Sequence, residues 1–271
     1  MGLGILSMCA TGMLLAFGPQ ITAWSERALA TVIPPASAAQ RLDDDTLIAR
    51  AQAARPEAKI QYMLLRPESA ATLRVGFRNA GILYMNPYSG DVIGQGSEIR
   101  DTLHKIEDWH RWLGNKKIGE PITGAVAIAF FTLSLSGMTL WWPRKVFTTK
   151  GEGHARNWNW HNTFGIASAL FILVITSTGI TMSYGLLNKK PAPGNQEKPS
   201  QAVAIIHDVP SKPKTFKGWI KPMHTGQAWG LPGQAINFLV ALSGFIQIFT
   251  GFALAWRRWE TSYNSRKRRS L

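Results

Sequence analysis

Long uncharged apolar stretches alternate with polar stretches along this chain of 271 residues. Three of them contain no Asp, Glu, Lys or Arg over 21, 24 and 23 residues: 122–142, 164–187 and 234–256. At a rise of about 1.5 Å per residue, a helix of this length covers roughly 30 Å, the thickness of the hydrocarbon core of a bilayer. Residues 1–24 are also uncharged. The pattern predicts four transmembrane helices, over residues 1–24, 118–142, 161–187 and 234–256.

The first apolar stretch has a competing interpretation as a cleaved secretory signal. Ala36-Ser37-Ala38 resembles a cleavage site. A secretory signal begins with positive charge, however, and the chain has no Lys or Arg before Arg27. A retained membrane span is therefore favoured. Cys9 is the only cysteine, which excludes an internal disulfide, and it is predicted to be a buried thiol.

The polar region 25–117 is long enough to form a small domain between the first two spans. An acidic turn followed by an Ala-rich segment predicts a helix over 43–55. Short β-rich segments separated by turn residues predict a small antiparallel sheet of three strands, over 60–65, 72–77 and 82–85. An amphipathic helix is expected over 97–113. The predicted fold class is mainly α: a four-helix membrane bundle with a small α+β domain.

Three further segments connect or follow the spans: a loop over 143–160, a loop over 188–233 and a basic tail over 257–271. The part 188–221 is rich in Pro, Lys and Gln and is expected to be flexible, with at most a short extended piece at 203–206.

The net charge of +14 is concentrated at the predicted membrane edges, so nucleic-acid binding is not expected. The tail 257–271 carries six Arg and Lys against one Glu, and the loop 143–160 carries four against one. The positive-inside rule places both in the cytoplasm. The loop 188–233 conflicts with this, because it carries seven Lys against two acids. The expected location is a bacterial inner membrane, with the N- and C-termini in the cytoplasm and the domain 25–117 in the periplasm.

An internal repeat emerges when the chain is shifted by 114 residues, without an insertion across 35 positions. The shift aligns His110 with His224 and Gly119 with Gly233, and it also aligns the pairs Gly137/Gly251, Trp142/Trp256 and Arg144/Arg258. Trp and Arg are ordinary interface anchors, but anchoring does not explain the two histidines.

A second shift, of 167 residues, aligns Thr11-Gly12 with Thr178-Gly179 and makes the first and third spans equivalent. His161 stands at the start of the third span, and its counterpart would lie a few residues before Met1. The partner histidine of His161 is therefore expected upstream of Met1.

Two parallel hairpin repeats imply a pseudo-two-fold axis along the membrane normal, which places His110 and His224 at the same depth. Two facing imidazoles are the axial ligands of a six-coordinate haem. A histidine near an interface is more often only a polar residue there, and that interpretation is kept for His104, His154 and His207. A zinc site is disfavoured because Cys9 is remote and no ligand cluster is evident.

These residues resemble a known family, the PepSY-associated transmembrane proteins. The segments that carry the resemblance are Asp108-Trp109-His110-Arg111-Trp112-Leu113-Gly114, Leu135-Ser136-Gly137-Met138-Thr139-Leu140-Trp141-Trp142-Pro143-Arg144, Trp160-His161, Thr178-Gly179 and Met223-His224-Thr225-Gly226. The resemblance implies that residues 42–94 form a periplasmic PepSY module. It also implies a role in iron acquisition, as in the haem-containing ferrisiderophore reductases. Members usually have another His-Arg-Trp-Leu-Gly-like stretch before the first span.

The resulting expectation is an oxidoreductase with b-type haem, one at His110 and His224 and a second at His161. Arg111 and Trp112 are expected beside the haem, with Arg111 on a propionate. Electrons would come from an unidentified cytoplasmic or quinol donor and pass to a periplasmic ferric siderophore; membrane lipid is the other partner. Two alternatives stay open. One is a non-enzymatic, membrane-anchored PepSY module that binds a protein; the other is a siderophore permease, for which only Asn237 and Gln247 supply polar groups within a span.

Overall fold

A computed structural model describes residues 1–35, 40–143, 147–187, 205–207, 213 and 215–269. The signal-cleavage motif Ala36-Ser37-Ala38 and most of the segment expected to be flexible lie outside these residues. The chain divides into two compact units. We call Met1–Phe17, Lys105–Asn188 and Lys214–Leu271 the membrane unit, and Gly18–His104 with Lys189–Pro213 the sheet unit.

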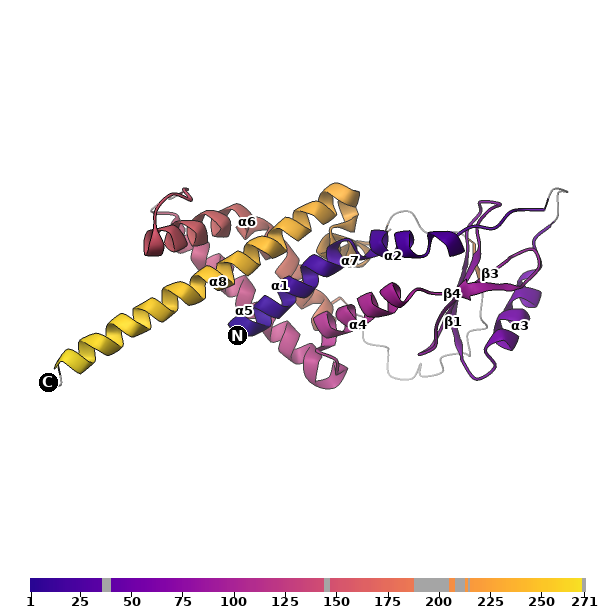
Figure 1. Cartoon of the computed structure of the whole chain (residues 1–271), viewed down its shortest axis with the longest axis horizontal. Helices are drawn as coiled ribbons and strands as arrows, with labels where there is room; N and C mark the ends of the chain where they lie inside the picture. Colours follow the sequence, from indigo (N-terminus) through magenta and orange to yellow (C-terminus); the bar gives the residue numbers. More distant parts are fainter. Residues whose placement is uncertain (36–39, 144–146, 188–204, 208–212, 214, 270–271) are drawn as a thin grey trace. The chain divides into compact units, whose positions relative to one another are not determined.

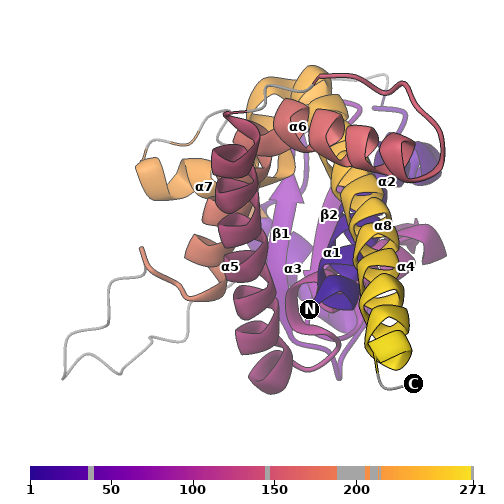
Figure 2. The same cartoon turned by 90° about the vertical axis from the view of Figure 1, so that its left-hand side faces the viewer.

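Four helices pack together in the membrane unit: α1 (Gly2–Ala16), α5 (Lys116–Trp141), α6 (Gly153–Ser183) and α8 (Gly230–Arg269). Around the group, α5 contacts α6, α6 contacts α8, α8 contacts α1, and α1 contacts α5. Figures 1 and 2 show the four helices from two sides. Three of these helices, α5, α6 and α8, are long and apolar enough to cross a membrane. The count rises to four if α1 and the short helix α2 (Gly18–Ser25) form one bent span.

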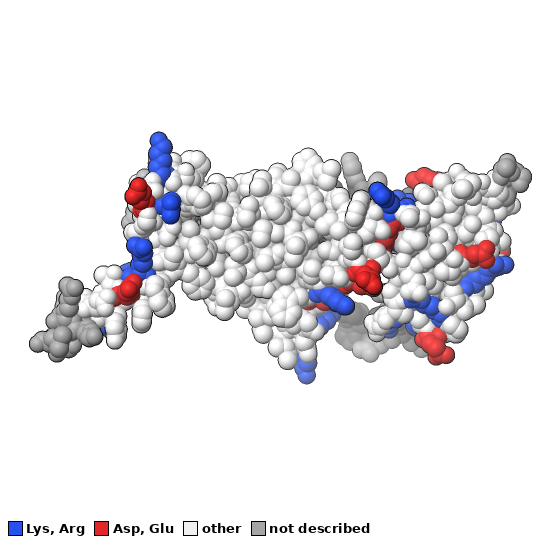
Figure 3. Space-filling view, viewed as in Figure 1, with Lys and Arg blue, Asp and Glu red and all other residues white. Residues whose placement is uncertain are grey.

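The outer surface of these helices is apolar. Large side chains such as Leu140, Leu170 and Phe249 are 72%, 66% and 70% exposed. The face in Figure 3 carries no Lys, Arg, Asp or Glu over the middle of the helices, and charge gathers toward their ends. Lipid tails, rather than water, suit such a surface. Inside the bundle, the Ser243 hydroxyl lies 3.0 Å from the carbonyl of Phe164 and 2.9 Å from the hydroxyl of Ser168, a polar link between membrane helices.

The first predicted span is interrupted, because α1 ends at Ala16 and α2 begins at Gly18. Pro19 is the physical reason. Proline lacks a backbone N–H and its ring clashes with the preceding turn, so it kinks or breaks a helix that would otherwise run through it. Helix α6 begins at Gly153, earlier than the predicted residue 161, and α8 stays helical through Arg269.

The expectation that 188–221 is flexible is wrong for its last part. Residues Phe216–Thr225 form the amphipathic helix α7, whose Thr215 side chain caps it by accepting from Gly218 N at 3.3 Å. A 3₁₀ turn, Gln227–Trp229, then leads into α8. Pro222 made the segment look irregular in sequence, but the helix continues through it.

The sheet unit contains the helix α3 (Asp44–Ala54) and a five-stranded sheet of order β4-β3-β2-β1-β5. The strands are β1 (Ile60–Leu65), β2 (Leu73–Phe77), β3 (Gly81–Met85), β4 (Val92–Gln95) and β5 (Ile205–Ile206). The three predicted strands and the helix are confirmed. The strand β4 was missed. The short extended piece expected at 203–206 contains β5, which pairs parallel with β1, so the sheet is mixed rather than antiparallel.

The core of this unit lies between α3 and the sheet. Leu47 and Ala51 from α3 pack on side chains of β1, β2 and β3, all nearly inaccessible to solvent: Met63, Leu65, Leu73, Val75, Leu83 and Met85. Asp43 caps α3 by accepting from Thr46 N at 2.9 Å. Helix α4 (Glu98–Trp112) follows β4 and contributes residues to both units. It is the predicted amphipathic helix.

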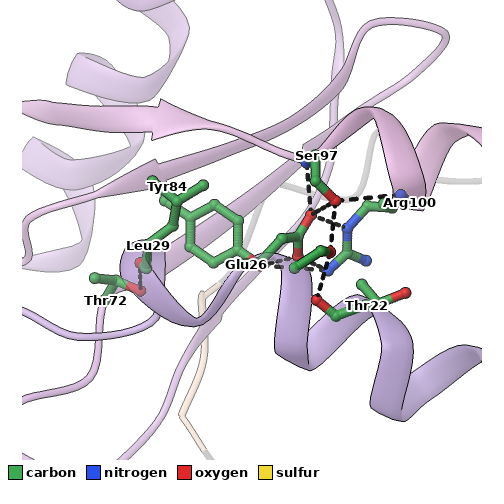
Figure 4. A network of polar contacts seen from close by, with 8 residues as sticks. Thr22, Glu26, Leu29, Thr72, Tyr84, Ser97 and Arg100 are labelled. Atoms are coloured by element: carbon green, nitrogen blue, oxygen red, sulfur yellow. Dashed lines mark hydrogen bonds and ion pairs between the residues drawn. The ribbon is translucent and has the colours of Figure 1, made fainter.

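A buried ion pair holds the end of α2 to the sheet and to α4 within the sheet unit (Figure 4). Glu26 is only 2% exposed, and its carboxylate accepts from Arg100 Nε (2.6 Å), Tyr84 Oη (2.6 Å) and Ser97 N (2.8 Å). Burial alone would raise the pKa of this carboxyl. The hydrogen bonds from Arg100, Tyr84 and Ser97, with the charge of Arg100, outweigh it and lower the pKa from 4.5 to about 2.

Candidate functional site: a facing histidine pair

His110 and His224 lie in the last turns of two short amphipathic helices, each of which precedes a long membrane helix. After His110, the backbone turns through positive φ at Leu113 and Gly114, and Asn115 caps α5. After His224, it turns through positive φ at Gly226 and Gly230 into α8. Each histidine thus lies near the end of an amphipathic helix, which is followed by a left-handed turn and then by a membrane helix.

In both turns, the backbone of the turn packs closely against a glycine at the start of the following membrane helix. A Cβ added at Gly119 would overlap the carbonyl of Trp112, and one added at Gly233 would overlap the carbonyl of Gly226. A shift of 114 residues relates Gly119 to Gly233 and Trp112 to Gly226. Glycine is required at these points because the backbone of the histidine-bearing segment lies directly on the membrane helix.

Two further side chains at repeat-related positions hold the histidine turns. Thr123 donates its hydroxyl to the carbonyl of Arg111 at 3.0 Å, and Asn237 donates its amide to the carbonyl of His224 at 2.7 Å. Thr123 and Asn237 are separated by 114 residues. Asn237 therefore serves the histidine segment, and Gln247 contacts Ser168 at 3.2 Å. Both intramembrane polar residues that a permease could use thus have partners inside the bundle.

We expect Gly119→Ala and Gly233→Ala each to disturb the adjacent histidine turn, since overpacking against backbone costs about 1–3 kcal/mol or more. The purified variants should lose thermal stability and, if haem is bound, haem content. Gly18→Ala is the matched control, because a Cβ there meets nothing within 4 Å. If all three variants had the same thermal stability and haem content, the close backbone contact assigned to Gly119 and Gly233 would be contradicted.

The centroids of the two imidazole rings lie 6.4 Å apart, and the ring planes are tilted by 59°. Metal–imidazole bonds are about 2 Å long and a ring centre lies roughly 1 Å beyond the ligating nitrogen, so two axial imidazoles on one iron stand about 6 Å apart. The observed separation fits a bis-histidine haem. In the described part of the chain, no group of three or more His, Cys, Asp or Glu gathers at one place.

The electrostatics of the pair favour neutral imidazoles. Burial, then the proximity of His224 and Arg111, lowers the pKa of His110 to about 4. Burial also lowers the pKa of His224, although its hydrogen bond to the carbonyl of Ile175 opposes the shift. His224 Nδ1 lies 2.9 Å from that carbonyl, so Nδ1 must donate, which leaves the lone pair on Nε2. Neutral imidazole with a free ring nitrogen is the form that binds a metal.

Arg111 and Trp112 follow His110 in the chain, and both contact protein groups; their place beside a haem stays a prediction. The Arg111 guanidinium lies 4.4 Å from the Trp112 ring centroid, and its Nη1 lies 3.3 Å from Glu107. Lys116 Nζ lies 5.1 Å from the same ring. An exposed ion pair such as Arg111–Glu107 contributes only about 0–1 kcal/mol, so a stronger anion can replace Glu107.

His161 lies on α6 and does not belong to this pair. Its Nδ1 lies 3.1 Å from the hydroxyl of Thr250 on α8. Its partner histidine, expected upstream of Met1, stays a prediction. His154 is exposed, and His207 Nε2 lies 2.9 Å from Asp44 in the sheet unit. Cys9 is a buried free thiol, as predicted.

Sequence reasoning missed the threonines that contact the three candidate ligands: Thr11, Thr178 and Thr250. The repeated Thr11-Gly12 and Thr178-Gly179 were visible, but only as a sign that two spans are equivalent. It also missed Glu26, because the partners of Glu26 come from distant parts of the chain.

The fold and its lipid-compatible surface define a multi-pass helical membrane protein. A family model described as PepSY-associated TM region matches residues 1–258. The chain belongs to this family. A search of curated proteins returned no match.

Proposed function

We propose that the protein is an inner-membrane electron-transfer protein that holds b-type haem between His110 and His224 and reduces periplasmic ferric siderophores. The observation that carries this proposal is the 6.4 Å separation of the centroids of the two imidazole rings. Neutrality of both imidazoles and engagement of the His224 Nδ1 by a carbonyl support it further. In this proposal the sheet unit is a PepSY-like module on the periplasmic side, and both termini are cytoplasmic.

A haem bound there would supply a one-electron Fe(III)/Fe(II) couple. The protein's own contribution is to bind and orient it: His110 and His224 supply the axial nitrogens, while Arg111 and Lys116 lie close enough to His110 along the chain to offer cations to propionates. One electron would convert the ferric ion of a siderophore to ferrous iron. The oxygen ligands of siderophores hold the softer ferrous ion less tightly, so iron would be released. His161 would take part in a second haem nearer the electron donor, a quinol or a cytoplasmic reductant.

The test is a single-turnover reaction of the full-length protein in detergent. Its haem is reduced without oxygen, freed from excess reductant and mixed with a ferric hydroxamate siderophore. We expect the ferrous haem bands to decay as ferrous iron appears, with one Fe(II) per haem oxidised, detected by a Fe(II) chelator. The gallium(III) complex of the same siderophore is the control, because it has the same shape and takes no electron.

Decay of the haem bands with the gallium complex, or no decay with the ferric complex, would contradict the proposal. The main alternative is an anchored module that binds a protein partner. It predicts a colourless, haem-free preparation from haem-sufficient cells.

A further inference from the structure

Each of the three candidate ligands has a threonine hydroxyl at its Nδ1. Thr11 of α1 lies 2.7 Å from His110 Nδ1. Thr178 of α6 lies 3.1 Å from His224 Nδ1, and Thr250 of α8 lies 3.1 Å from His161 Nδ1. In every case the threonine belongs to a different helix from the histidine. The contact therefore fixes the histidine relative to the bundle.

The direction of these hydrogen bonds follows from a second contact of each hydroxyl. Thr11 donates to the carbonyl of Ser7 at 2.7 Å, Thr178 to that of Val174 at 2.8 Å and Thr250 to that of Ile246 at 2.8 Å. A hydroxyl has only one hydrogen, so each threonine oxygen is left to accept from the histidine. The Nδ1 atoms then carry the hydrogen, and the Nε2 atoms keep the lone pair that can bind iron.

The residue after each of these threonines is a glycine, and the same imidazole lies against it. An added Cβ at Gly12, Gly179 or Gly251 would stand 3.7, 3.2 or 3.5 Å from the Cε1 of His110, His224 or His161, respectively. Cε1 is the ring carbon between the two nitrogens. A Cβ at 3.5 or 3.7 Å would be an ordinary van der Waals contact, so only Gly179 lies closer to its ring than a larger residue would readily allow. At all three sites the threonine holds the ring nitrogen next to this edge.

From this threefold recurrence we propose that Thr11-Gly12, Thr178-Gly179 and Thr250-Gly251 are positioning elements for the haem-ligating histidines. Each pair sets the Nδ1–H tautomer and the rotation of one imidazole, and the accepting hydroxyl makes that imidazole a stronger donor to iron. The inference rests on the proposed haem-binding function. Loss of an accepting hydroxyl is expected to raise the midpoint potential of the haem and to weaken its binding about 10- to 100-fold.

Thr11 offers the sharpest test, because its hydroxyl is the one partner recorded for His110 Nδ1 among the described residues, whereas His224 Nδ1 also contacts the carbonyl of Ile175. Thr11→Val keeps the shape and removes the hydroxyl, and Thr11→Ser restores the hydroxyl. Thr132→Val is the matched control, since among the described residues the Thr132 hydroxyl bonds within its own helix, to the carbonyl of Ile128 at 3.0 Å. The measurements are haem content, redox titration and the electron paramagnetic resonance signal of the ferric haem, on the full-length protein.

We expect Thr11→Val to shift the potential upward, alter the resonance signal and lower haem retention, with Thr11→Ser near wild type. Thr178→Val should have a smaller effect, and Thr132→Val none. If Thr11→Val holds haem and matches Thr132→Val in potential and signal, the inference is overturned and the proposed function stands. If wild type and all variants lack haem, the proposed function itself fails.

Discussion

Either His110→Ala or His224→Ala is expected to remove the same haem. In the fold, the two rings lie 6.4 Å apart and would share one iron, so losing either ring leaves a five-coordinate, weakly held site. The absorption bands of low-spin haem from this site should disappear in both single variants. Haem content per chain should fall by the same amount in each, and the double variant should lose no more.

The matched control for this pair is His154→Ala, because His154 is an exposed histidine on α6. It should keep the wild-type spectrum and haem content. Losses that add in the double variant would mean that His110 and His224 serve different sites. Full haem retention in either single variant would contradict the shared-iron assignment.

Arg100→Met is expected to destabilise the sheet unit strongly. Glu26 is 2% exposed, and Arg100 is its charged partner. Removing one member of a buried ion pair leaves an uncompensated charge and costs about 3–5 kcal/mol. Hydrogen exchange of β2 and β3 in the full-length protein should accelerate accordingly. Asp44→Asn is the control, because it breaks an exposed pair with His207 in the same unit and should cost about 1 kcal/mol or less.

The same network gives the sheet unit a defined response to acid. The pKa of Glu26 in the fold is about 2, below its ordinary value of 4.5. A carboxyl with a lowered pKa contributes stability that is fully present above its ordinary pKa and is lost as the pH falls through the value in the fold. Protection of β2 and β3 should therefore fall between about pH 4.5 and 2 in the wild type. Arg100→Met should lose this part of the pH dependence, and an unchanged profile in that variant would contradict the role of Arg100.

The sequence predicts the membrane helices well because uncharged apolar runs of 21 to 24 residues are rarely found outside membrane spans. The α3 helix and the strands β1, β2 and β3 are confirmed for a similar reason: each has local signals, such as the Asp43 cap and the turn with positive φ at Asn79. Two elements lack such signals. Strand β5 has two residues and depends on its pairing with β1, and β4 contains Gly94, which weakens a strand pattern.

The candidate site was predicted in part for a different reason, the repeat. The 114-residue shift related His110 to His224, and the two rings face each other in the fold. The threonines that contact the histidines could not be predicted in the same way. Thr250 lies 89 residues from His161, and no local pattern in the sequence connects them. Likewise, Glu26 has a charge at the end of an apolar run, which in sequence is indistinguishable from an ordinary interface residue.

The most direct test of the haem assignment is the spectrum of the purified, full-length wild-type protein together with its haem count. We expect a low-spin ferric signal typical of two imidazole ligands, sharp ferrous bands on reduction, and at least one haem b per chain. A protein that folds with its membrane helices intact, yet takes up no haem when hemin is supplied, would contradict it.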